Sequence, residues 1–79
     1  MNLYRADFHA RCPVNAARIH YHWTLTTHEV VRVEEINDAL DTIHAGFHEN
    51  IADSLRALFG GRQTLIAEHH GVTIETARP

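Results

Sequence analysis

Regular alternation of apolar and polar residues near the start of the chain is the feature that most constrains its fold. Between residues 4 and 12 every second residue is apolar or small, and the positions between them are arginine, aspartate or histidine. The pattern repeats over residues 18–26, where the apolar face consists of Ile19, Tyr21, Trp23 and Leu25. Because successive side chains point to opposite faces of a β-strand, both segments are predicted to be half-buried strands. Pro13 and Asn15 predict a turn between them.

A helical period follows the two strands. Apolar residues recur at spacings of three and four and form one stripe: Ile36, Leu40, Ile43, Phe47, Ile51, Leu55 and Leu58. The stripe predicts one long helix over residues 34–59, which the tandem glycines at 60–61 end. That helix would measure about 39 Å, whereas an eight-residue strand spans about 27 Å. We therefore allow for a bend or break at Gly46, the internal glycine of the segment.

The end of the chain reads as a second hairpin. Strands are expected near 64–68 and 72–76, joined by a turn at which Gly71 takes a positive φ. The VVRV sequence at 30–33 is expected to lengthen the second strand or to form a brief strand of its own. The order ββαββ predicts an α+β fold in a single domain (1–79), with one long helix, continuous or broken, on one face of an antiparallel sheet.

Composition limits the setting in which the chain works. With 44% hydrophobic and 22% charged residues, it is expected to be globular. It lacks both an apolar run of roughly 20 residues and the pattern of a secretion signal. A single cysteine, Cys12, excludes an internal disulfide and suits a reducing compartment, and alternation turns this thiol toward the core, where it is inert packing. We therefore expect a cytoplasmic protein that is not inserted in a membrane.

Eight histidines raise the question of a metal site. His20 and His22 are predicted on the outward face of the second strand, opposite Trp23. A four-residue loop at 13–16 would pair Phe8 with Tyr21, His9 with His20, and Asp7 with His22. Since cross-strand neighbours have Cβ atoms about 5 Å apart, the candidate zinc ligands are His9, His20, His22 and Asp7. The alternative is an open polar face that carries ordinary exposed histidines.

Four further histidines have structural interpretations beside the metal one. His44 and His48 stand four residues apart at the edge of the apolar stripe, and we expect half-buried boundary residues rather than a chelating pair. His69 and His70 occupy a tight turn, where adjacent side chains diverge.

Several short patterns resemble the T-fold enzymes of the 6-pyruvoyl-tetrahydropterin synthase type. The matching positions are Phe8 and Ala10, Cys12, His20 and His22, Glu49 and Asn50, and Glu75 and Thr76. The resemblance implies zinc ligation by His20 and His22 and a pterin-like ring whose base edge contacts Glu75. However, Cys12 stands where the family has a third zinc-binding histidine, and the family's Leu-Asp-His segment reads LDT at 40–42. The resemblance thus implies a degenerate metal- or pterin-binding protein.

The predicted helix is strongly acidic, with six carboxylates against Arg56 alone. The helix dipole accounts for acidic residues in the first turn but not for the later ones. The acidic face is either simply solvated or an anionic surface that binds a basic groove on a partner. In the second case its carboxylates would take the place of the phosphates of a nucleic acid. The candidate surface consists of Glu35, Asp38, Asp41, Glu49 and Asp53.

In size, single-domain build and acidity, the chain resembles the small anti-CRISPR inhibitors that phages encode. This resemblance implies a non-enzymatic inhibitor without a cofactor. Its partner would be a protein with a basic surface, such as a nucleic-acid-binding complex, and it would not contact nucleic acid directly. The open sheet face or an edge strand is also expected to support a homo-oligomer.

Overall fold

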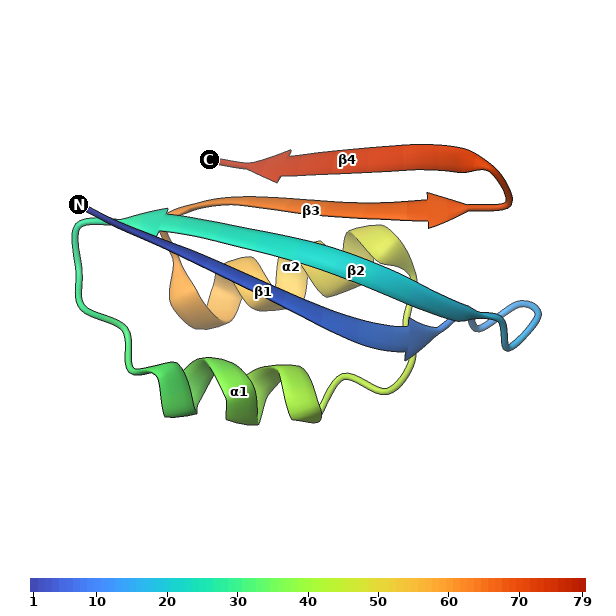
Figure 1. The fold of residues 1–79 in the computed structure, drawn as a ribbon, viewed down its shortest axis with the longest axis horizontal. Helices are drawn as coiled ribbons and strands as arrows, with labels where there is room; N and C mark the ends of the chain where they lie inside the picture. Colours follow the sequence, from blue (N-terminus) through green and yellow to red (C-terminus); the bar gives the residue numbers. More distant parts are fainter.

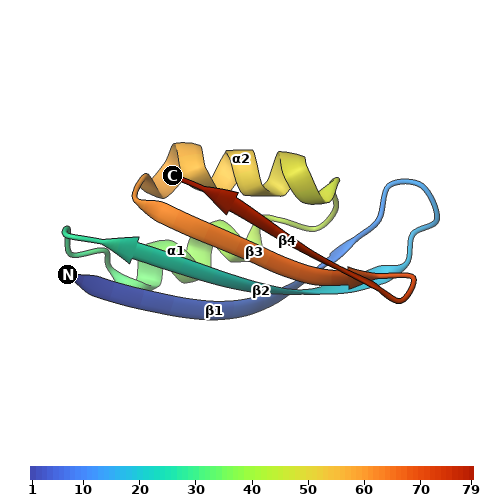
Figure 2. The ribbon, with the colours of Figure 1, turned by 90° about the horizontal axis from the view of Figure 1, so that it is seen from above.

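A four-stranded antiparallel sheet with two helices makes up the computed structural model, which describes residues 1–79 (Figure 1). The elements in chain order are β1 (Asn2–Arg11), β2 (Arg18–Thr27), α1 (Val33–Asp41), α2 (His48–Phe59), β3 (Arg62–His69) and β4 (Val72–Arg78). The strands lie in the order β1-β2-β3-β4, so both helices are inserted between the two central strands. Figure 2 shows the helices on one side of the sheet. The predicted α+β class and antiparallel sheet are confirmed.

The register of the first hairpin is the one that a four-residue loop at 13–16 predicts. Phe8 pairs with Tyr21, His9 with His20, and Asp7 with His22. The Cys12 N–H donates to the Ala17 carbonyl at 2.9 Å, which leaves residues 13–16 as the loop. In the second hairpin, His70 and Gly71 have φ values of 50° and 84°, as a two-residue turn between antiparallel strands requires. Both predicted hairpins are therefore present.

The prediction of one long helix is wrong, because residues 42–47 separate α1 from α2. This segment pairs with the end of β1: the Arg11 N–H donates to the His44 carbonyl at 2.9 Å, and the Gly46 N–H donates to the Arg11 carbonyl at 3.2 Å. These bonds satisfy backbone groups of an edge strand that a continuous helix would leave unpaired. The predicted break position, Gly46, lies within the segment.

A strand at residues 30–33 is also not formed. Residues 30–32 belong to neither helix nor strand, and Val33 begins α1. The Val31 N–H donates to the Tyr4 hydroxyl at 3.0 Å, which fastens this connection to β1. Neither helix has the length and apolarity that crossing a membrane would require.

The core lies between the sheet and the helices and contains thirteen buried apolar residues. Its largest fully buried side chains are Trp23, Tyr21, Leu25, Leu55 and Leu65. Two residues of the predicted stripe, Phe47 and Leu58, are instead exposed. Because of the break, α1 and α2 each turn their own apolar face toward the sheet. The apolar stripe predicted for a single helix over residues 34–59 therefore does not match the buried residues of the two helices. The opposite face of the sheet remains open to solvent and carries the outward histidines.

Candidate metal centre on the open face of the sheet

Asp7, His20 and His22 converge on the open face of the sheet. Asp7 lies on β1 directly across from His22, and His20 is two residues before His22 on β2. Because side chains alternate along a strand, both histidines point to the same side, where their ring centroids are 4.7 Å apart. One ligand atom from each of the three residues lies within 4.8 Å of the other two.

The Asp7 carboxylate bridges the two imidazoles. The His20 Nε2 is 3.2 Å from one carboxylate oxygen, and the His22 Nδ1 is 2.9 Å from the other. Ligands of a tetrahedral zinc ion stand about 3.3 Å apart when the metal–nitrogen distance is about 2.0–2.1 Å. Each histidine–carboxylate distance is close to this spacing, and an ion bound there would replace the two hydrogen bonds. About half of each side chain is exposed, so an ion can reach the group directly.

Electrostatics keep the carboxylate ionised. Hydrogen bonds from His22 and then His20 hold the pKa of Asp7 below its usual value. His9 stands beside the group, with its ring centroid 4.4 Å from that of His20. Desolvation, reinforced by Arg18 and His20, lowers the pKa of His9 and favours its neutral form. A neutral imidazole and an ionised carboxylate are the states that bind metals.

The two histidine rings of this cluster have few hydrogen-bond partners that would fix their orientation. Neither His20 nor His22 has a second hydrogen bond within the protein, so Asp7 is the only hydrogen-bond partner that orients the rings. Metal-binding histidines usually donate their other N–H to a second protein group, and losing such a partner weakens affinity about 10–100-fold. The geometry therefore fits an exchangeable ion better than a permanently bound structural one.

Glu75 is not part of this cluster. The registers place it on the same face and in the same cross-strand row as His22, but Ile66 on β3 lies between them. With neighbouring strands about 4.8 Å apart, Glu75 is roughly 10 Å from His22. The T-fold resemblance implies that His20 and His22 bind zinc and that Glu75 contacts a pterin-like ring. In this structure Glu75 and the two histidines do not lie in one cluster.

The five acidic residues are all exposed but belong to two helices. Glu35, Asp38 and Asp41 lie on α1, while Glu49 and Asp53 lie on α2. The Arg78 Nε–H donates to Asp53 at 2.8 Å, so one of the five is neutralised within the chain. A single acidic helix face over residues 34–59 is therefore replaced by a free acidic cluster on α1 and a partly paired one on α2.

The other histidines are placed differently from the sequence expectation. His44 is exposed in the 42–47 segment and His48 is buried at the start of α2, so the expected pair of half-buried boundary residues is wrong. His69 contacts His48, whereas His70 contacts Asn15 in the other hairpin loop. Cys12 packs against the core, as expected.

Three polar residues are buried without having been predicted to be so: His48, Gln63 and Thr76. Gln63 stands two and four residues before the inward-facing Leu65 and Ala67, and extending that alternation would have placed it in the core. No comparable local signal exists for His48, because its burial depends on where α2 begins.

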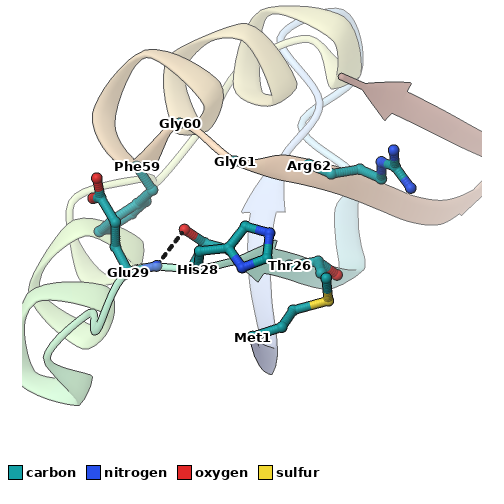
Figure 3. Close-up of a pocket in the computed structure, with 9 residues that line it drawn as sticks. Met1, Thr26, His28, Glu29, Phe59, Gly60, Gly61 and Arg62 are labelled. Atoms are coloured by element: carbon teal, nitrogen blue, oxygen red, sulfur yellow. Dashed lines mark hydrogen bonds between the residues drawn. The ribbon is translucent and has the colours of Figure 1, made fainter.

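A pocket of about 500 Å³ lies where β2 ends and β3 begins (Figure 3). Its lining consists of Met1, Thr26, Thr27, His28, Glu29, Phe59, Gly60, Gly61 and Arg62. The Glu29 N–H donates to the Thr27 hydroxyl at 3.1 Å, but Glu29 and Arg62 lie on different sides of the pocket and form no ion pair. Its polar groups do not converge as those around Asp7 do.

No protein-family model, curated protein or solved structure matches this chain. Its class is defined by fold and site alone: a two-layer α+β domain with a His-His-Asp group on the open face of its sheet.

Proposed function

We propose that this chain is a non-catalytic metal-binding domain that holds a divalent transition-metal ion at Asp7, His20 and His22. The observation that carries the proposal is the convergence of two imidazole nitrogens and one carboxylate oxygen from adjacent strands. Nitrogen and oxygen donors in this combination suit zinc and its neighbours in the first transition row. Three protein ligands leave one tetrahedral position for water or for His9.

The partial T-fold resemblance supports the same histidines. In that family a third histidine completes the zinc site, whereas Cys12 occupies the matching position here and packs against the core. Asp7 supplies a third donor on the opposite, open face, and so takes the role that Cys12 does not fill. The pterin part of the resemblance has less support, because a ring held by Glu75 would have to extend over Ile66 to reach the histidines.

Calorimetric titration of untagged protein with zinc tests the proposal. We expect saturable binding of one ion per chain. The double variant H20A/H22A should lose binding, because it removes both nitrogen donors. His28 provides a matched control, since it is an exposed histidine beyond the far end of β2, and H28A should bind like the wild type. Unchanged affinity in H20A/H22A, or no saturable binding by the wild type, would refute the proposal.

A second candidate function is recognition of a basic protein surface by the acidic helices. The specific support is α1, which holds four carboxylates and no basic residue in nine positions. Glu34 is partly paired with Arg32 at 3.5 Å, while Glu35, Asp38 and Asp41 have no ion pair. Such a surface accelerates association with a basic partner and loses this advantage in salt. This fits a small inhibitor of the anti-CRISPR kind.

Charge reversal separates this function from metal binding. A basic host protein recovered with the wild type should bind E35K/D38K more weakly, and its binding should weaken with salt. E68K reverses a charge on β3, away from the helices, and serves as the control. Equal loss in both variants would argue against a helix-specific surface. Sedimentation of the same samples measures self-association, for which the edge strands β1 and β4 are the expected contacts.

A further inference from the structure

A second pair of histidines lies on the helix side of the sheet, away from the metal centre. His48 is the first residue of α2 and is only 6% exposed. Its Nε2–H donates to the Leu65 carbonyl at 3.1 Å, so its Nδ1 is the acceptor nitrogen of a neutral ring. This Nδ1 lies 3.3 Å from the His69 Nε2, which donates to it. Two side-chain bonds thus join the first turn of α2 to β3.

The surroundings of His48 favour its neutral form. From β2, the Tyr21 ring packs with its centroid 5.6 Å from that of His48; Tyr21 is fully buried, and its hydroxyl has no hydrogen-bond partner. His69 on β3 and Arg78 on β4 are the basic groups nearby, and Glu49 is the one carboxylate. Burial lowers the pKa of His48, and His69 and Arg78 add to this effect, while the Leu65 bond and Glu49 oppose it.

Position in the helix adds to the cost of a positive charge. The N-terminus of a helix carries partial positive charge from its unpaired N–H groups, and a cation there is destabilising. A protonated His48 would also have an N–H on Nδ1, directed at the His69 Nε2. That contact persists only when His69 is neutral and carries its proton on the other nitrogen, so the two rings cannot both be protonated in this arrangement.

We propose that the His48–His69 pair is an acid-sensitive latch for α2. At neutral pH it holds the first turn of α2, and the 42–47 segment that leads into it, against the sheet. Protonation of the pair releases this end of the helix. The other end stays docked through Gln63, which donates to the carbonyls of Leu55 and Gly60, and the ten-residue pairing of β1 with β2 stays intact.

Amide hydrogen exchange followed by NMR between about pH 8 and about pH 5, the range in which histidine changes charge, tests the latch. After correction for intrinsic exchange, we expect the first turn of α2 to lose protection in acid while β1 and β2 keep theirs. H48Q should remove this pH dependence, because glutamine does not titrate and can still donate to Leu65. H44Q changes an exposed histidine just before α2 and should behave like the wild type.

Two outcomes would overturn the proposal: loss of protection in α2 and in β1–β2 at the same pH, or an unchanged acid response in H48Q. If H48Q fails to fold, the wild type still decides the question through the ring signals of His48. These signals should titrate together with the loss of α2 protection. Titration of His48 with no change in α2 would refute the latch.

Discussion

Replacement of Gln63 by leucine should destabilise the fold more than any exposed substitution. Gln63 is 3% exposed; its carbonyl oxygen accepts from the Trp23 indole N–H at 2.9 Å, and its amide donates to the Leu55 and Gly60 carbonyls at 3.0 and 2.7 Å. Leucine has a similar size but makes none of these bonds. The buried indole N–H then has no partner, which costs about 1–3 kcal/mol, and the two carbonyls lose a donor.

The free energy of unfolding is therefore expected to fall by about 2–4 kcal/mol. The two carbonyls add little to this loss, because the Leu55 carbonyl can still accept a hydrogen bond within the helix and the Gly60 carbonyl is near solvent. A domain of this size has about 4–12 kcal/mol of stability, and each kcal/mol shifts its melting temperature by about 4–8 °C. Urea unfolding followed by fluorescence of Trp23, the single tryptophan, measures the change.

Thr64 provides the control, since it is the next residue on β3, points to the open face and makes no side-chain hydrogen bond within the protein. We expect T64V to stay within about 0.5 kcal/mol of the wild type. A Gln63→Leu variant that unfolds at the wild-type urea concentration would refute the reasoning, as would an equal loss in T64V.

Four further predictions concern stability. In the folded chain the pKa of His48 lies below its ordinary value of 6.5, so the unfolded chain binds the proton more strongly. The free energy of unfolding should therefore decrease as the pH falls below about 6.5. A urea midpoint that does not change with pH would contradict this. In Gly61→Ala, the added Cβ would lie 2.7 Å from the Thr26 carbonyl oxygen at a φ of 66°, so a loss of about 1–3 kcal/mol is expected in thermal unfolding. Gly71→Asn is the contrasting case: its φ of 84° still causes backbone strain, but its Cβ would meet nothing within 4 Å, so its melting temperature should fall less than that of Gly61→Ala. Asp53→Ala removes an exposed ion pair with β4 and should cost less than about 1 kcal/mol in urea unfolding, with a larger loss arguing that the pair is more than a surface contact.

Metal binding should also appear as stabilisation. Zinc at a hundred times its dissociation constant raises the free energy of unfolding by about 2.7 kcal/mol when it binds only the folded chain. Thermal unfolding with and without zinc measures this shift, and D7N should reduce it because the carboxylate donor is lost. A shift of equal size in D7N would show that zinc binds elsewhere.

The metal centre was predictable from the sequence as far as its geometry is concerned. Alternation put His20 and His22 on one outward face, and the short loop at 13–16 fixed the register that brings Asp7 opposite His22. Both are local properties, since a strand has a two-residue period and a hairpin's register follows from its loop. That these side chains bind a metal is still a prediction. The position of Glu75, the base-edge contact that the T-fold resemblance implies, did not follow from the sequence, because its distance from His22 depends on the number of strands between them.

The sequence by itself determined the four strands, the two hairpins and the helical character of the middle segment, because each follows from side-chain period and turn residues along a short stretch. The sequence allowed for a break at Gly46, but tertiary structure decided that this segment is two helices, since the break depends on hydrogen bonds between Arg11 and the 44–46 backbone, some thirty residues away. The same break exposes Phe47 and buries His48 against β3. A periodic pattern states which face of an element is apolar, but where that element stops depends on the backbone groups that neighbouring strands leave to be satisfied.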